Sequence, residues 1–152
     1  MPTKKASSSK SPRIAVVVAQ FNEYITDRLL AACLDELKNL KVPQKNVAVS
    51  KVPGSFEIPV VALKYAKKKT IDAVICLGAV IRGETYHFET VADGVAQGVM
   101  QVSLLSGKPV IFGVLTTDTV DQANRRAEEK GDNKGRDAAQ AAIDMIGILR
   151  NL

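Results

Sequence analysis

Residues 78–91 combine glycines with polar and titratable side chains in one short stretch. The stretch reads Gly-Ala-Val-Ile-Arg-Gly-Glu-Thr-Tyr-His-Phe-Glu-Thr-Val, and it follows a continuous apolar run at residues 73–77 that is typical of a strand buried on both faces. Glycine lets the backbone approach a ligand, while the polar side chains could bind a substrate or transfer protons. A helix is expected to follow, so the stretch is predicted to be a functional strand-to-helix loop.

His87, the only histidine in the chain, lies in this stretch. Imidazole has an unperturbed pKa near ~6.5, so it can accept and donate protons at neutral pH as a general acid or base must. The alternative is an ordinary surface histidine or one that caps the following helix. The choice between these roles depends on where the fold places the residue.

The net charge of +5 does not predict a nucleic-acid partner. Four positive charges precede residue 14 without any acid, and subtracting them leaves +1 for the rest of the chain; they belong to Lys4, Lys5, Lys10 and Arg13. With 5% aromatic residues and no Trp, the chain has neither a basic stripe nor a platform on which bases could stack.

The N-terminal segment is expected to be a disordered basic tail over residues 1–13, ahead of one folded domain over residues 14–152. Its first eleven residues are rich in Ser and Lys and lack the apolar core of a signal peptide, although they could be the remnant of a trimmed targeting segment. No apolar run approaches the ~18 residues of a membrane span, so we expect a soluble protein without a membrane partner.

The two cysteines predict buried, reduced thiols and a cytoplasmic location. Cys33 falls on the apolar side of an expected helix and Cys76 falls inside an expected strand. There is no Cys-x-x-Cys pair and no cluster of His or Cys ligands, so no metal site is expected.

Four apolar or alternating segments alternate with segments of helical periodicity. The expected strands cover residues 14–19, 46–52, 73–77 and 110–115. The expected helices cover about residues 25–40, 59–69 and 88–105, a shorter one that is capped by Asp118 or Thr119, and residues 136–149. This order predicts an α/β fold, a flavodoxin-like three-layer sandwich whose four-stranded parallel sheet carries helices on both faces.

Ligands of such sheets bind beyond the carboxyl ends of the strands. All four expected strand ends carry unusual residues, at 21–22, 53–57, 78–87 and 112–118. Because these loops are expected to meet at one edge of the sheet, His87 would lie among other polar groups, which favours the acid/base role.

The four loops also carry recognisable motifs. These are Gln-Phe-Asn, Val-Pro-Gly-Ser-Phe-Glu-Ile-Pro, Gly-Ala-Val-Ile-Arg-Gly-Glu-Thr-x-His-Phe, and Gly-Val-Leu-Thr-Thr-Asp-Thr-x-x-Gln-Ala, in this order. From about Ile14 to the C-terminus the chain resembles the 6,7-dimethyl-8-ribityllumazine synthase family of riboflavin biosynthesis. The resemblance implies a cofactor-free condensation of 5-amino-6-(D-ribitylamino)uracil with 3,4-dihydroxy-2-butanone 4-phosphate, which releases phosphate and water.

The resemblance assigns a set of residues to the pyrimidine and its ribityl chain. It implies that Phe21 stacks on the ring, although an exposed or buried position must separate this role from that of a core aromatic. The Glu57 carboxylate would accept hydrogen bonds from ribityl hydroxyls, or else only favour a helix start. The remaining members are Ser55 and Phe56, the backbone of Ala79, Val80 and Ile81, and Phe112.

A second set is implied for the phosphate. Glu84 and Thr85 would contact it at a helix start, and the planar fork of Arg126 would clamp it. Lys130 and Lys134 would add positive charge. Inorganic phosphate is therefore an expected ligand beside the two substrates.

The residues at the expected strand ends do not fit two other functions of this fold. A receiver domain needs acidic residues where the chain has Gln20 and Gly78, and an electron carrier that binds flavin needs a Ser/Thr/Gly-rich phosphate loop after the first strand. A homologue that binds flavin or lumazine without catalysis remains an alternative, but His87 together with Arg126 favours the enzyme. Gln20 and Ser55 stand where many family members have Arg and Ala, and neither supplies chemistry.

The helix at 88–105 predicts self-assembly. It is apolar around much of its circumference, and Gly94 and Gly98 form a small-residue strip for close approach, so one sheet face cannot bury all of it. The resemblance implies a homopentamer with sites between neighbouring subunits. The connection at residues 128–135 has no insertion, which in the family accompanies a 60-subunit icosahedral shell, although Glu128 and Asp132 stand where shell-forming members commonly have Gly.

Overall fold

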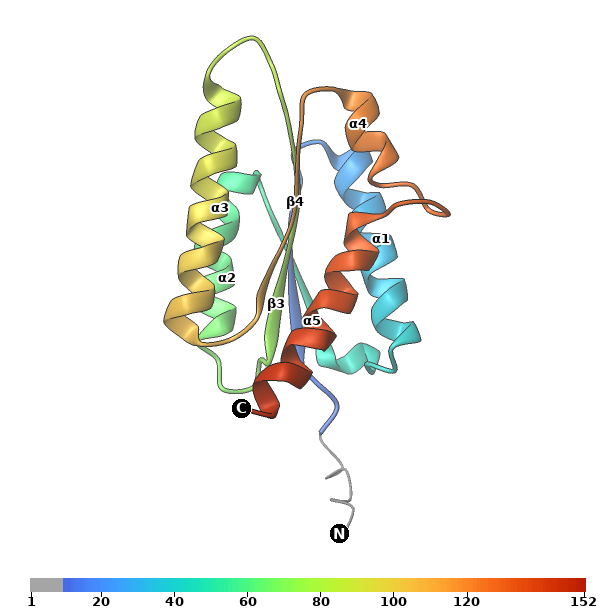
Figure 1. Cartoon of the computed structure of the whole chain (residues 1–152), viewed down its shortest axis with the longest axis vertical. Helices are drawn as coiled ribbons and strands as arrows, with labels where there is room; N and C mark the ends of the chain where they lie inside the picture. Colours follow the sequence, from blue (N-terminus) through green and yellow to red (C-terminus); the bar gives the residue numbers. More distant parts are fainter. Residues whose placement is uncertain (1–9) are drawn as a thin grey trace, which may run out of the picture.

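Four parallel strands form one sheet in the computed structural model, which describes residues 10–152 (Figure 1). The strands lie in the order β2-β1-β3-β4 and comprise β1 (Ile14–Ala19), β2 (Val47–Val52), β3 (Ala73–Ile81) and β4 (Val110–Thr117). All six residues of β1 are buried, as expected for a continuous apolar run in a sheet covered on both sides. The predicted α/β fold is confirmed; residues 1–9 of the predicted tail lie outside the described residues.

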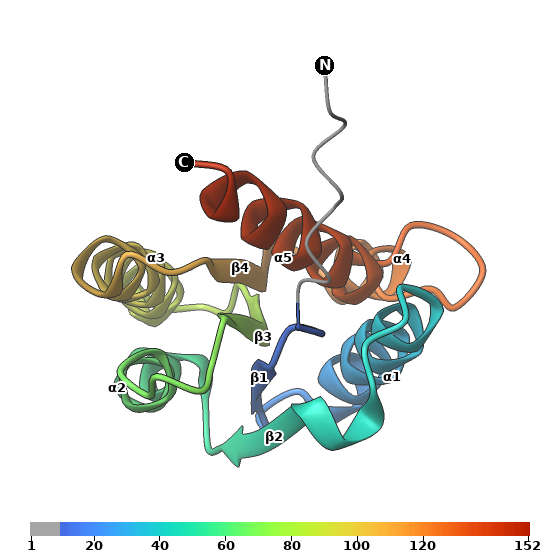
Figure 2. The same ribbon diagram turned by 90° about the horizontal axis from the view of Figure 1, so that it is seen from below.

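Helices cover both faces of the sheet (Figure 2). On one side lie α2 (Ile58–Ala66) and α3 (His87–Ser106), and on the other lie α1 (Glu23–Asn39), α4 (Val120–Arg125) and α5 (Lys134–Arg150). Side chains of β1 alternate between two apolar clusters, because successive residues of a strand point to opposite faces. None of the helices within residues 10–152 has the length and apolar character to cross a bilayer.

Two strands extend further than predicted. Residues 78–81 continue β3 and residues 116–117 continue β4, because the ladder between these strands runs without a break to the pair Ile81 and Thr117. The predicted loop therefore begins at Arg82. Phe112 lies inside β4 opposite Cys76, as the strand predicted at residues 110–115 implies, so only its inclusion in the group expected at the carboxyl end of that strand was wrong.

The helix ends are fixed by side chains and by short turns. Thr119, one of the two predicted caps, accepts from the backbone N–H of Gln122 in a capping box. Asn133 caps α5, which starts two residues earlier than predicted; its Oδ1 accepts from Gly135 N at 2.8 Å. The helix α2 ends at Ala66, ahead of its predicted end at residue 69.

Both cysteines are buried free thiols, as predicted. Burial raises the pKa of Cys33 and of Cys76 to about 12, because a thiolate in an apolar environment loses its hydration. Both thiols are therefore protonated at neutral pH.

The glycine strip of α3 is occupied by the chain itself. A Cβ at Gly94 would lie 2.5 Å from Cε2 of Phe56, and one at Gly98 would lie 2.5 Å from Cγ of Pro59. The expectation that these glycines admit a neighbouring copy was therefore wrong. The helix still leaves an apolar outer side, where Met100, Leu104 and Leu105 are 60%, 75% and 80% exposed.

Gly135 should be essential for packing, because a Cβ there would lie 2.0 Å from the carbonyl oxygen of Leu29 in α1. We expect Gly135→Ala to lower the free energy of unfolding by about 2 kcal/mol, since overpacking costs about 1–3 kcal/mol and the gain in helix propensity offsets at most about 1. Gly147, in the same helix with nothing within 4 Å of its Cβ position, is the matched control. Thermal unfolding at one protein concentration should place Gly135→Ala below the parent and Gly147→Ala above it; equal shifts would contradict the close approach.

Candidate active site

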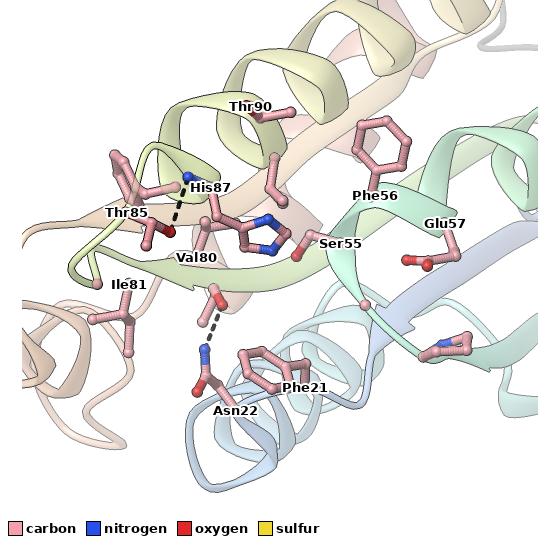
Figure 3. Close-up of a pocket in the computed structure, with 16 residues that line it drawn as sticks. Phe21, Asn22, Ser55, Phe56, Glu57, Val80, Ile81, Thr85, His87 and Thr90 are labelled. Carbon is pink, nitrogen blue, oxygen red and sulfur yellow. Dashed lines mark hydrogen bonds between the residues drawn. The ribbon is translucent and has the colours of Figure 1, made fainter.

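A cavity of about 660 Å³ lies where β1, β2 and β3 end (Figure 3). This first cavity has the size of a small-molecule site. Nine of the residues predicted from the sequence line it: Phe21, Ser55, Phe56, Glu57, Ala79, Val80, Ile81, Thr85 and His87. Three separate loops thus meet at one edge of the sheet, as predicted.

The turn after β1 presents Phe21 to the first cavity. Its side chain is 72% exposed, so it does not belong to the apolar core. Asn22, the next residue, has a left-handed backbone (φ 62°, ψ 47°), and its Nδ2 donates to the carbonyl oxygen of Ala79 at 2.8 Å. The N–H of Phe21 also donates to the carbonyl of Pro53 at 3.0 Å. The turn is therefore tied to the ends of both neighbouring strands.

The sequence placed Asn22 at the end of the first strand, but no role in the cavity was assigned to it. The signal was present, because Asn is one of the few residues other than Gly that adopts positive φ readily, and it follows directly on the exposed aromatic. Its side-chain bond to the end of β3 was not readable from the sequence, since the two residues are 57 positions apart.

The turn after β2 forms the opposite wall. It is a short 3-10 helix, Ser55–Glu57, in which Ser55 is buried while Phe56 and Glu57 are exposed. The hydroxyl of Ser55 packs directly against the backbone of Gly78, because a Cβ at Gly78 would lie only 2.4 Å from Ser55 Oγ. Glu57 precedes α2, but its carboxylate makes no capping hydrogen bond, so the side chain is available to a ligand.

His87 is the first residue of α3, and its imidazole faces the cavity on the side of Ser55 (Figure 3). The helix cap is Tyr86 rather than His87, and no side chain makes a capping bond there. The N–H of His87 lies 3.4 Å from Thr85 Oγ1, which draws the loop inward at the start of the helix. Of the two alternatives to an acid/base role, the helix cap is therefore excluded, whereas His87 is exposed, as a surface histidine would be.

Three predicted residues do not line this cavity. Glu84 is exposed in the loop before α3, whereas Phe112 and Arg126 line a second hollow of about 370 Å³ beside β4 and α5. Lys134 lies in the same second hollow, and Lys130 lies in neither. The expectation that all four loops converge within one chain was therefore too broad, because β4 is an edge strand and Phe112 lies in its middle.

The second hollow has its own fixed geometry. Arg126 is the residue directly after α4, and one terminal nitrogen of its guanidinium donates to the carbonyl of Gln122 at 3.0 Å. The backbone N–H of Lys134 donates to the backbone carbonyl of Arg126 at 2.9 Å. This bond keeps the backbones of the two cationic residues next to each other. Among residues 10–152, no group of three or more His, Cys, Asp or Glu side chains could hold a metal ion.

The family model of 6,7-dimethyl-8-ribityllumazine synthase matches residues 11–150 of the 152-residue chain. The chain belongs to this family. It is therefore a transferase of riboflavin biosynthesis, and the reaction of the 6,7-dimethyl-8-ribityllumazine synthases is the condensation predicted from the loop motifs. The predicted family, fold and activity are confirmed, while the roles of individual residues stay predictions.

The packing of Phe56 against Gly94 allows a test of whether Phe56 forms a wall of the first cavity. We expect Gly94→Ala to push the exposed ring out of place and to raise KM for the pyrimidine substrate by about tenfold, because displacements near 1 Å can cost that much or more. Gly98→Ala makes an equally close contact with Pro59, which does not line the cavity. Steady-state kinetics with each substrate varied would distinguish the two variants, and equal effects would argue against a wall formed by Phe56.

Proposed function

We propose that the first cavity binds 5-amino-6-(D-ribitylamino)uracil and that His87 is the acid/base group of the lumazine-forming reaction. The observation that carries the proposal is that the only imidazole of the chain faces the cavity whose walls hold the exposed rings of Phe21 and Phe56. An aromatic face suits a flat pyrimidine, and an imidazole suits repeated proton transfer at neutral pH.

The remaining walls suit the polar parts of this substrate. The pairing of β3 with β1 stops at Leu77, so the edge of residues 79–81 opposite to β4 can offer backbone hydrogen bonds to the heterocycle without any special side chain. The Glu57 carboxylate and the Ser55 hydroxyl can accept from ribityl hydroxyls. Joining the amine to the ketone, expelling phosphate and closing the ring all move protons, so a single base close to the pyrimidine can serve each step.

Replacement of His87 by Ala tests the acid/base role. General acid/base groups contribute about 10²–10⁴ in rate, so single-turnover formation of lumazine by His87→Ala should slow by a factor in that range. Binding of the pyrimidine should change little, because its ring contacts are proposed to come from other residues. A rate within about twofold of the parent would reject the assignment on the same scale.

The phosphate of the second substrate is proposed to lie between two copies of the chain. Thr85 reaches the first cavity, whereas Phe112, Arg126 and Lys134 lie in the second hollow. We place the second hollow of one subunit against the first cavity of its neighbour, so that Arg126 clamps the phosphate with its planar fork and Glu84 and Thr85 complete the contact. Contacts between two different surfaces of identical subunits form a ring when the rotation that relates the subunits closes.

A homopentamer with shared sites is the proposed assembly, and the apolar side of α3 formed by Met100, Leu104 and Leu105 supports it. An apolar surface of this kind on one helix is typical of a subunit contact. We further propose that twelve pentamers form the 60-subunit shell in the cytoplasm. The connection between α4 and α5 supports this, because it is short and closed by a bridge between Ala127 and Asn133.

The backbone conformation at Glu128 and Asp132 is compatible with the proposed shell. Within the described residues, positive φ at residues other than Gly occurs only at Asn22 and Lys41. The two acidic residues therefore adopt backbone angles open to any side chain, and the glycines common at these positions in shell-forming members are not required here.

Sedimentation velocity at neutral pH in phosphate buffer tests the proposed assembly. We expect one fast boundary of the size of a 60-subunit particle. A single boundary of pentamer size would remove the shell and leave the shared site, whereas a monomer that turns over both substrates would remove both.

A further inference from the structure

Arg82, the first residue after β3, contacts two chain segments at the edge of the first cavity, the end of β4 with its following turn and the first turn of α3. Its Nε lies 2.7 Å from Oδ1 of Asp118 in the turn after β4, and a terminal nitrogen pairs with Oε1 of Glu89 in the first turn of α3. The guanidinium carbon lies 4.4 Å from the ring centroid of Phe88, a distance at which a cation and a ring attract each other. Its backbone N–H donates to the carbonyl of Thr117 at 2.9 Å.

We propose that Arg82 is a positioning residue of the reaction, which fixes the loop at residues 82–86 and the start of α3 so that Thr85 and His87 face the substrate. The inference rests on the proposed roles of these two residues. Both ends of the loop are held through this one side chain, since it binds one neighbour of His87 directly, Phe88, and also binds Glu89 one residue further on. In a loop whose residues are all exposed, few other contacts can do this.

The location of Arg82 also relates the two hollows. Its neighbours in sequence, Ile81 and Gly83, line the first cavity, while Thr117, whose carbonyl it binds, lines the second hollow. A brace between these segments therefore fixes the position of the loop at residues 82–86 relative to the end of β4. The planar guanidinium suits such a brace, because its Nε binds Asp118 while a terminal nitrogen binds Glu89.

The electrostatics favour a brace over a free anion site. The hydrogen bonds to Asp118 and to Glu89 raise the pKa of the Arg82 guanidinium, and the hydrogen bond from Arg82 lowers the pKa of the Glu89 carboxyl. Arg82 and Glu89 therefore favour their charged forms, and the guanidinium carries one formal positive charge against two carboxylate partners. A phosphate that approached Arg82 directly would meet both carboxylates, whereas the brace keeps these carboxylates turned to Arg82.

Two variants distinguish a brace from direct phosphate binding by the sign of their effects. Arg82→Met removes the cation, and the double variant Glu89→Gln/Asp118→Asn removes its two charged partners while leaving the cation. We expect both to lower kcat/KM by about tenfold, through a higher KM for the butanone phosphate and a lower kcat, with KM for the pyrimidine unchanged. The triple variant should be no worse than either, because all three side chains act as one unit.

Arg125→Met is the matched control, since within residues 10–152 this exposed guanidinium makes only a long contact, 3.5 Å, with the carbonyl of Asp121. Tighter binding of the butanone phosphate by the double variant would overturn the inference in favour of direct binding by a freed Arg82. Equal kinetics of Arg82→Met and Arg125→Met would overturn it in favour of a plain surface pair. If His87→Ala keeps full activity, the proposed function fails, whatever the Arg82 variants show.

Discussion

The ladder between β3 and β4 is the constraint on which the rest of the site depends. It runs from the pair Val74 and Val110 to the pair Ile81 and Thr117 without a break. The loop that leads to His87 therefore starts at a fixed position along the sheet, directly after Ile81. Because β3 is buried along almost its whole length, the loop cannot slide without exposing apolar surface. The same ladder places Asp118 beside Arg82, and so links the start of α3 to the end of β4.

Close contacts at glycines set the positions of the surrounding walls. The serine of the β2 turn occupies the space left by Gly78, and the ring of Phe56 occupies that left by Gly94. On the opposite face, Gly135 lets α5 approach the backbone of α1. A well-packed interior transmits even small changes of volume, so these positions control the shape of the cavity without contacting a substrate.

Much of the fold was readable from the sequence because its signals are local. Continuous apolar runs predicted three of the strands, an alternating β-rich segment predicted β2, and helical periodicity predicted the main helices. The ends of β3 and β4 were not predicted, because Gly78 is disfavoured in strands and the polar Thr116 interrupts the apolar run, while pairing across the sheet extends both strands. The bond from Asn22 to Ala79 and the brace by Arg82 were missed for the same reason, since both join residues far apart in the chain.

The candidate site was predicted in part. The loop motifs identified nine residues of the first cavity, yet Phe112 and Arg126 lie in the second hollow, where the order of residues along one chain cannot show what faces them. The glycine strip on α3 was misread because small residues predict close approach but not the identity of the partner. In this fold the partner is the chain's own β2 turn and α2.

The central claim is that each site combines the first cavity of one subunit with the second hollow of its neighbour. Co-expression of two subunits that are each inactive, His87→Ala and Arg126→Ala, tests it most directly by lumazine formation at low butanone phosphate. Random mixing into rings should restore about one quarter of the sites, because only those that pair the intact cavity with the intact hollow are complete. Co-expression of His87→Ala with Phe21→Ala, both altered in the first cavity, should restore none. Mixed assemblies of the first pair that show no activity above the sum of the parents would contradict the account.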